Sequence, residues 1–275
     1  MRDDREKQGG AALFSCFSFQ DKFGSRLKCS ENVCFSDRGS LKGESMEPLI
    51  RVVDMCKIYN PGENEVRALD HVNLEIFQGE FVAIIGQSGS GKSTFMNMLG
   101  CLDVPTSGEY FLNGTDVSTM ADNDLSEVRN REIGFIFQGF NLIPNLTAVE
   151  NVELPLIYRG IDKKTRRQLA MESLHMVGLD KRVHHKPNEM SGGQQQRVAI
   201  ARALANKPAV ILADEPTGNL DSKTTMEVMG VLKASSDKYH QTILMVTHNE
   251  AIAQTCDRII RIEDGRVYER GGAWV

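Results

Sequence analysis

One stretch of the chain has the residue types and spacing of a phosphate-binding loop. It matches the pattern G-x-x-x-x-G-K-[ST], in which the backbone N–H groups of a glycine-rich turn wrap around phosphate oxygens. Lys92 is expected to reach the β- and γ-phosphates of a nucleotide, and the Ser93 hydroxyl to bind Mg²⁺. A glycine-rich turn without a ligand is disfavoured by the apolar run before the loop and the helical pattern after it. The residues expected to contact the nucleotide here are Gly86, Gln87, Ser88, Gly89, Ser90, Gly91, Lys92, Ser93 and Thr94.

Two adjacent carboxylates could supply hydrolytic chemistry. Asp214 and Glu215 follow the apolar run 209–213, and a carboxylate at the carboxyl end of such a strand lies where open α/β sheets bind ligands. Asp214 is suited to orienting Mg²⁺ through water, because Mg²⁺ keeps much of its hydration. Glu215 is placed to polarise an attacking water as a general base. The alternative is a solvated acidic turn, and the phosphate-loop pattern earlier in the chain argues against it.

His248 stands at the end of a third apolar run, 242–247. If that run is a strand of the same sheet, the imidazole reaches the edge where Glu215 lies. It could then bond to the γ-phosphate and orient that carboxylate. By contrast, His184 and His185 lie in a polar linker without the cysteine or acidic neighbours of a zinc site, so we expect no metal there.

Apolar runs and turn signals indicate the elements that would position these side chains. Residues 81–85, 209–213 and 242–247 are apolar enough to be inner strands of a parallel sheet covered on both faces. The first of them leads through the glycine loop into a helical pattern at 93–99. The sequence therefore predicts an α/β fold with a mostly parallel sheet. Antiparallel strands are predicted at 50–53 and 72–76, in a hairpin at 110–114 and in a closing hairpin at 259–268.

Residues 190–195, Met-Ser-Gly-Gly-Gln-Gln, resemble the signature sequence of ATP-binding cassette (ABC) ATPases. The family motif usually begins with Leu, and Met190 is a conservative departure that should change packing rather than chemistry. Ser191 stands where a helix N-cap belongs, and an apolar helical pattern follows it. The resemblance implies that Ser191, Gly193 and Gln194 bind the ATP of an opposite subunit, and hence a homodimer built through shared ATP sites. A simple helix cap is the alternative for this segment alone.

Three further residues match the ABC pattern one by one. Tyr59 resembles the aromatic residue that stacks on adenine, and Gln138 the glutamine that touches Mg²⁺ and the attacking water. Asp221 resembles part of the loop along the dimer interface, which implies that it lies at the nucleotide. The resemblance covers about residues 47–275. It implies a P-loop NTPase core with a RecA-like sheet, an antiparallel β subdomain and an inserted α-helical signature subdomain at about 139–200. ATP and Mg²⁺ are the implied substrate and metal.

Within the family, several segments are similar to the ATPases of macrolide-exporter, lipoprotein-releasing and antimicrobial-peptide-resistance systems. That branch implies an ATP-hydrolysing subunit at the cytoplasmic face of the plasma membrane. It would energise a separate integral-membrane permease, linked through Gln138, for export or extraction of a peptide, lipoprotein or drug. The similar segments are 60–63, 66–69, 98–103, 137–142 and 216–221.

Two other functions are compatible with ABC motifs. Soluble ABC ATPases acting on ribosomes carry two cassettes, and those acting on DNA place long coiled coils between the phosphate loop and the signature. Here a single loop is followed by about 100 residues without heptads between Lys92 and Ser191. A regulatory adapter that binds ATP without turnover is disfavoured because Glu215 and His248 are both present.

Composition sets further limits on the function. The chain has 275 residues, 41% of them hydrophobic, which suits one globular α/β unit with a sizeable core. Its formal charge of −5 and pI of about 5.8 are not those of a basic, nucleic-acid-binding protein. We therefore expect no nucleic-acid partner. No apolar run approaches the ~20 residues of a membrane span. Any membrane association is therefore expected to come through a partner protein.

Residues 1–45 differ from the rest of the chain, because they mix charges with Ser, Gly and Phe and show no periodicity. We expect a disordered extension, or upstream sequence included through a mistaken start codon, with Met46 just before the family-like part. Cys29 and Cys34 could form a metal or redox pair, but no second ligand pair accompanies them. The cysteines expected to be reduced thiols of the core are Cys56, Cys101 and Cys256.

Overall fold

The computed structural model of the chain describes residues 47–62 and 64–269. All of them belong to one compact unit, Ser45–Val275. The expectations for residues 1–45, including the Cys29–Cys34 pair, lie outside the described residues.

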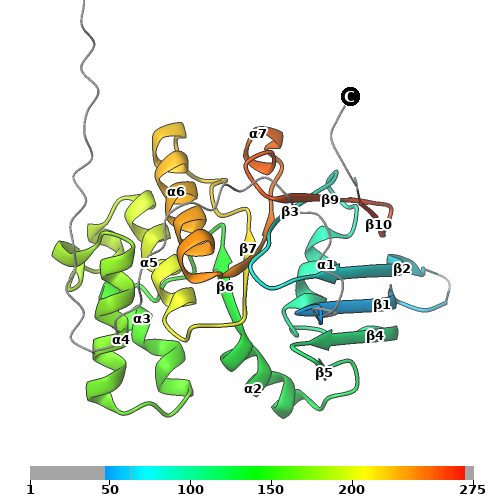
Figure 1. Ribbon diagram of the computed structural model, residues 1–275, viewed down its shortest axis with the longest axis horizontal. Helices are drawn as coiled ribbons and strands as arrows, with labels where there is room; N and C mark the ends of the chain where they lie inside the picture. The colour runs from blue at the N-terminus through cyan, green and yellow to red at the C-terminus, as the bar shows by residue number, and fades with distance from the viewer. Residues whose placement is uncertain (1–46, 63, 270–275) are drawn as a thin grey trace, which may run out of the picture. The chain divides into compact units, whose positions relative to one another are not determined.

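A six-stranded sheet forms the centre of this unit (Figure 1). Its strands, in spatial order, are β10 (Arg266–Glu269), β9 (Arg258–Glu263), β3 (Phe81–Ile85), β8 (Thr242–Val246), β7 (Val210–Asp214) and β6 (Ile133–Phe137). All neighbours pair in parallel except β10 and β9. Every side chain of β3 and β8 is buried, as the apolar runs predicted. Because parallel strands point the same way, the residues that follow β3, β6, β7 and β8 meet at one edge of the sheet.

A second sheet is antiparallel, with the strand order β2 (Val66–Ile76), β1 (Ile50–Tyr59), β4 (Ser107–Leu112) and β5 (Thr115–Asp116). β1 and β2 are much longer than the predicted strands at 50–53 and 72–76. The β1–β2 register shifts at bulges after Val52, so the alternation of buried and exposed residues breaks there and the sequence pattern stops short. The predicted hairpins at 110–114 and 259–268 are both confirmed.

Alternate residues of the central strands belong to two different apolar clusters. Leu212 and Leu244 pack with α1 (Lys92–Leu99) and the antiparallel sheet. Ile211 and Ile243 pack instead with α5 (Gly192–Leu204) and α6 (Ser222–Tyr239). The parallel sheet is therefore covered on both faces, which explains the lack of polar positions inside its strands.

The predicted helical subdomain is present between β6 and β7. There, α3 (Ala148–Tyr158) and α4 (Lys163–Met176) pack against each other and against α5. Cys56 and Cys101 are buried free cysteines, and Cys256 is a partly buried one. Among the described residues, no helix is both long and apolar enough to cross a bilayer. The remaining helical elements are α2 (Asp122–Glu132), α7 (Glu250–Ala253) and the 3₁₀ turns Asp180–Arg182 and Pro187–Glu189.

Candidate nucleotide-binding and hydrolytic site

The predicted phosphate loop connects β3 to α1, and its glycines are required by close backbone contacts. A Cβ atom on Gly91, which has a φ of 105°, would lie 2.4 Å from the carbonyl oxygen of Ala68 in β2. A Cβ atom on Gly86 would lie 2.2 Å from the carbonyl oxygen of Ile262 in β9. The loop therefore rests on strands of both sheets, and only glycine lets the backbone approach so closely.

Lys92 is buried inside this loop. Its Nζ donates hydrogen bonds to the carbonyl oxygens of Gly86, at 2.8 Å, and Gln87, at 2.6 Å. Burial lowers the pKa of the Lys92 ammonium group, and the carboxylates of Glu215 and Asp214 partly offset this effect. The ammonium group is thus held within the loop, where phosphate oxygens could replace the two carbonyl oxygens as its hydrogen-bond partners.

The predicted carboxylates and histidine meet at the carboxyl edge of the sheet. Asp214 ends β7, and the Glu215 N–H donates to the carbonyl oxygen of Val246, which ends β8. The Glu215 carboxylate pairs with His248, whose Nε2 lies 2.5 Å from Oε1. Burial raises the pKa of the Asp214 carboxyl, and the adjacent Glu215 charge raises it further. Glu215 has a φ of 45°, a strained backbone of the kind that clusters at functional sites.

Gln138 follows β6, the edge strand next to β7, and lies against the turn after Glu215. A Cβ atom on Gly218 would be 2.5 Å from the Gln138 amide nitrogen. The Asn219 side chain donates to the Gln138 carbonyl oxygen at 3.1 Å. The structure thus brings Gln138 to the loop that follows the two carboxylates.

The residues proposed to hold Mg²⁺ carry suitable donor atoms. Mg²⁺ prefers hard oxygen ligands and keeps several waters. Ser93 offers an exposed hydroxyl in the first turn of α1, Asp214 a carboxylate, and Gln138 an amide oxygen on an exposed side chain. These oxygen-bearing groups fit the ion, which would neutralise phosphate charge when bound.

The signature residues form the start of α5. Ser191 caps the helix through a reciprocal pair of bonds with Gln194, in which each side chain accepts from the other residue's N–H, at 3.4 and 3.1 Å. Gly193 is buried against α6, where a Cβ atom would lie 2.1 Å from the Thr224 methyl carbon. The predicted N-cap is therefore confirmed, and Gly193 has a packing role as well.

Asp221 caps α6 in the described chain. Its Oδ1 accepts from the N–H groups of Lys223 and Thr224, at 3.1 and 3.0 Å, and its Oδ2 from the Thr224 hydroxyl, at 2.6 Å. Bonding to the Thr224 hydroxyl is the main cause that lowers the pKa of this carboxyl. The sequence interpretation placed Asp221 at a nucleotide and missed this capping role, although Asp before a helical pattern is itself an N-cap signal.

Tyr59 ends β1 and is anchored by a residue that the sequence interpretation missed. Its hydroxyl donates to Asp103 Oδ2 at 3.1 Å, while the Lys57 ammonium group binds Asp103 Oδ1 at 2.7 Å. The same ammonium group lies 5.1 Å from the Tyr59 ring centroid. Burial raises the pKa of the Tyr59 hydroxyl, and Asp103 adds to the shift. No periodic signal marks Asp103, which lies in the loop after α1.

Comparisons with known proteins agree with this geometry. The family model described as ABC transporter matches residues 69–218. An ABC transporter ATP-binding protein of Thermotoga maritima is 54% identical over 225 residues, which cover 81% of this chain and 94% of that protein. The macrolide export ATP-binding/permease protein MacB of Vibrio parahaemolyticus is 51% identical over 219 residues. That match covers 80% of this chain but only 33% of MacB.

A solved structure shows the same fold. The ATP-binding cassette MJ0796, in a dimeric post-hydrolysis state bound to ADP and Pi, has a TM-score of 0.73 and 48% identity. The match covers 81% of this chain and 100% of that one. MJ0796 is an ABC transporter ATP-binding protein of Methanocaldococcus jannaschii. The chain therefore belongs to the ABC transporter family, and it is an ABC ATPase with the P-loop fold and an antiparallel β subdomain.

Proposed function

We propose that this ABC ATPase is the subunit that energises a membrane permease, for export or extraction of a peptide, lipoprotein or drug. The observation that carries the proposal is the match to one third of MacB, which is named as both an ATP-binding and a permease protein. In such a complex the chain works at the cytoplasmic face of the plasma membrane and is held there by the permease.

Glu215 and His248 support a hydrolytic role at the phosphate loop. The Glu215 carboxylate is oriented by His248 at 2.5 Å, so it is positioned to take a proton from water attacking the γ-phosphate. Lys92 would exchange its bonds to two loop carbonyls for bonds to the β- and γ-phosphates. The reaction needs no covalent intermediate, because positioning and charge neutralisation supply the catalysis.

A homodimer would complete each ATP site. A capped helix still has first-turn N–H groups without intrahelical partners, and a helix N-terminus attracts anions. Within the described part of the chain, no hydrogen bond joins Ser191 to the phosphate loop. We assign Ser191, Gly193 and Gln194 to the ATP of a second copy, and two-fold symmetry then yields two equivalent sites. Dimeric structures of MJ0796 support this assembly.

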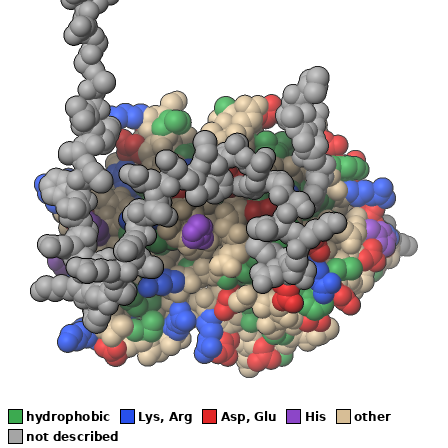
Figure 2. Space-filling model, viewed as in Figure 1, with side chains coloured by type: hydrophobic (Ala, Val, Ile, Leu, Met, Phe, Trp, Pro, Cys, Tyr) green, Lys and Arg blue, Asp and Glu red, His purple; other side chains and the backbone are tan. Residues whose placement is uncertain are grey.

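A groove next to the 137–141 segment fits part of the permease. It has a volume of about 800 Å³ and is lined by residues of α2, β6, α3 and α5, with Leu102 and Tyr158 among the apolar ones and Arg131 among the basic ones. Tyr158 is 82% exposed. Figure 2 shows Lys and Arg side chains between α2 and the α3–α4 pair on this face. We assign the groove to a cytoplasmic segment of the permease.

The segment after Gln138 connects this groove with the ATP site. Phe140 and Asn141 have φ angles of 62° and 49°, a rare backbone for a bulky residue. Arg202, which lines the groove, donates to the carbonyl oxygens of both residues, at 2.9 and 2.5 Å. A permease segment entering the groove would therefore act on a strained loop that begins at Gln138, which contacts the turn after Glu215.

Purification of the tagged chain from detergent-solubilised membranes tests the proposal. We expect an integral-membrane protein with a large extracytoplasmic domain to co-purify with the wild type. Tyr158→Glu should lose this partner and keep basal ATPase activity. Tyr239→Glu is the matched control, since Tyr239 is also exposed but lies at the end of α6 outside the groove. Co-purification with ribosomes or nucleic acid alone would favour a soluble ABC ATPase and overturn the proposal.

A further inference from the structure

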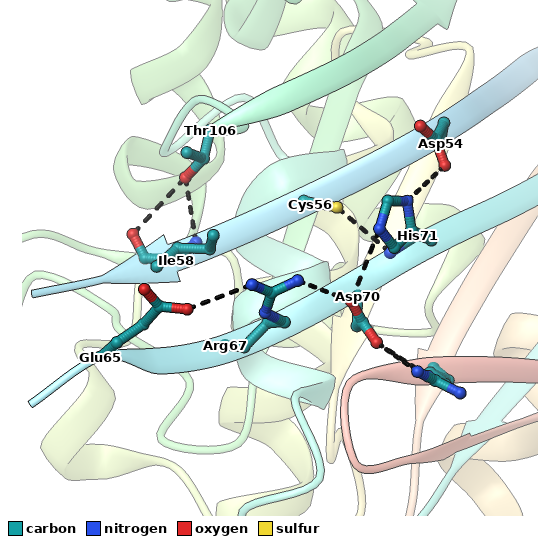
Figure 3. Close-up of polar contacts among 9 residues, drawn as sticks. Asp54, Cys56, Ile58, Glu65, Arg67, Asp70, His71 and Thr106 are labelled. Carbon is teal, nitrogen blue, oxygen red and sulfur yellow. Dashed lines mark hydrogen bonds and ion pairs between the residues drawn. The ribbon is translucent and has the colours of Figure 1, made fainter. Parts of the chain in front are cut away.

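Cys56, Asp70 and His71 bring three metal-ligating groups together on the antiparallel sheet (Figure 3). One ligand atom from each side chain lies within 4.8 Å of the other two. The cause is a bulge. Met55 pairs with Val72 and Lys57 with Leu69, so β2 has one more residue than β1 between these pairs, and both Asp70 and His71 face Cys56.

The His71 ring is already oriented as in a metal site. Its Nδ1 lies 2.6 Å from Asp54 Oδ1, and its Nε2 lies 3.9 Å from Asp70 Oδ1. Figure 3 shows the ring between the two carboxylates. With the Nδ1 proton donated to Asp54, Nε2 keeps a lone pair on the side of Asp70. Histidine ligands of metals generally donate the N–H of their other ring nitrogen to a carboxylate, a backbone carbonyl or water.

The backbone at this pair is unusual for non-glycine residues. Asp54 has a φ of 50° and His71 a φ of 52°. Residues held in the left-handed region cluster at binding and catalytic sites, because surrounding structure must fix them there. The hydrogen bond between these two side chains therefore joins two strained positions on neighbouring strands.

The other two ligand groups, those of Cys56 and Asp70, are also held in place by hydrogen bonds. The Cys56 sulfur accepts the His71 backbone N–H at 3.3 Å, so its position relative to β2 is fixed. Arg266 binds Asp70 Oδ2 at 2.8 Å, and Arg67 reaches Oδ1 at 3.3 Å. These two guanidinium groups fix the position of the Asp70 carboxylate beside His71.

We propose that Cys56, Asp70 and His71 bind a divalent transition-metal ion of the zinc type, with Asp54 orienting the histidine. A thiolate, an imidazole and a carboxylate suit Zn²⁺, whereas Mg²⁺ prefers oxygen ligands alone. Three protein ligands leave a fourth tetrahedral position for water. Bonds of about 2.0–2.3 Å require ligand atoms about 3.3–3.8 Å apart, so the group contracts slightly on binding. Binding releases the Cys56 thiol proton.

The proposed metal site is connected to the phosphate loop by two hydrogen bonds. The Asp70 N–H donates to the carbonyl oxygen of Gly265 at 2.9 Å, and the Gly265 N–H donates to that of Ser90 at 3.0 Å. Contraction around a metal ion would therefore pull on the turn that supports the loop. If occupancy of the metal site changes nucleotide affinity, nucleotide must change metal affinity by the same factor.

Metal titration of the full, untagged chain tests the proposal. Wild-type protein in reducing buffer with excess Mg²⁺ should bind one equivalent of Zn²⁺ in competition with a chromophoric chelator. Co²⁺ should give a thiolate charge-transfer band. Cys56→Ser and His71→Asn should abolish both signals. Asp54→Asn should weaken Zn²⁺ binding about 10–100-fold, because it acts only through the histidine.

Two control variants separate this site from other thiols. Cys256→Ser should bind metal like the wild type, and so should a chain in which Cys16, Cys29 and Cys34 are all replaced by Ser. Melting temperatures without metal show whether each variant folds. If Cys56→Ser does not fold, His71→Asn decides, since Asn tolerates the left-handed backbone at that exposed position. The absence of one-equivalent binding by wild type, or its survival in folded His71→Asn, overturns the proposal.

Discussion

The phosphate-loop edge and the Ser191 helix end differ in how far one chain completes them. At the loop edge, Lys92 already bonds to two carbonyls and Glu215 is paired with His248. At the start of α5, Ser191 and Gln194 only satisfy each other. In the first region a carboxylate contacts an imidazole and interacts through charge with an ammonium group. The second region has only the N–H groups of a helix end.

The origin of this difference is geometric. Parallel strands bring residues from distant parts of the sequence to one edge of a sheet. A helix terminus offers N–H groups and partial positive charge along its own axis, within one turn. The comparison indicates that acid–base chemistry is assembled within the chain, while the anion-binding helix end serves a ligand held by another molecule.

Glu215→Gln should have the largest effect on ATP hydrolysis at the phosphate-loop edge. Loss of the general base is expected to slow hydrolysis about 10²–10⁴-fold while ATP still binds. Phosphate release measures the rate, and size-exclusion chromatography with ATP should reveal an accumulated dimer. Glu227→Gln, which removes an exposed carboxylate paired with Arg197, is the control. Turnover within a few-fold of wild type would remove Glu215 from the catalytic role.

Mixing two inactive variants tests whether each ATP site takes its loop from one chain and its helix end from the other. Lys92→Ala spoils the loop half of every site, and Ser191→Arg spoils the helix half. A mixed dimer places both lesions in one site, so random pairing leaves about a quarter of all sites intact. ATPase activity should therefore recover partially on mixing. Full activity of either variant alone, or a crosslink between Ser191 and Lys92 of one chain, would contradict the shared site.

Tyr59→Ala should weaken ATP binding at the other end of the nucleotide. Stacking on a base contributes about 1–3 kcal/mol, so KM for ATP should rise about 5–150-fold while kcat changes little. Tyr59→Phe keeps the ring and loses only the bond to Asp103, so its KM should stay closer to that of wild type. Equal KM values for wild type and Tyr59→Ala would rule out stacking.

Gly193→Ala should lower the unfolding free energy by about 1–3 kcal/mol, because the added methyl group overpacks against Thr224. Thr224→Ser removes the clashing methyl group and keeps the hydroxyl that bonds to Asp221. The double variant should therefore regain stability in a urea titration. Gly230→Ala is the control, because nothing lies within 4 Å of its added Cβ atom. Equal denaturation midpoints for both glycine variants would show that α5 and α6 can move apart enough to accommodate the added methyl group.

Patterns with strong local causes could be predicted from the sequence. The apolar runs around Phe81, Ile211 and Ile243 became buried parallel strands because both sheet faces are covered. The glycine-rich loop and the Ser191 cap depend on backbone rules that act within a few residues. Their common edge followed from strand direction, and that placed Glu215 near His248.

The parts that could not be predicted depend on register and side-chain pairing. The β1–β2 bulges hid the length of both strands and brought Cys56 to His71, although the two are far apart in sequence. Asp103 anchors Tyr59 across a loop that has no periodic pattern. Such contacts are set by packing, which a single sequence does not encode locally.

Gln196 gives α5 a second connection. Its buried amide donates to the carbonyl oxygen of Pro216 at 2.7 Å, one residue after Glu215. In the proposed dimer, the same helix meets the neighbour's ATP at its start and its own catalytic turn through Gln196. ATP bound at one site then affects the catalytic turn of the other site. The dimer is therefore expected to hydrolyse ATP cooperatively, with a Hill coefficient above one.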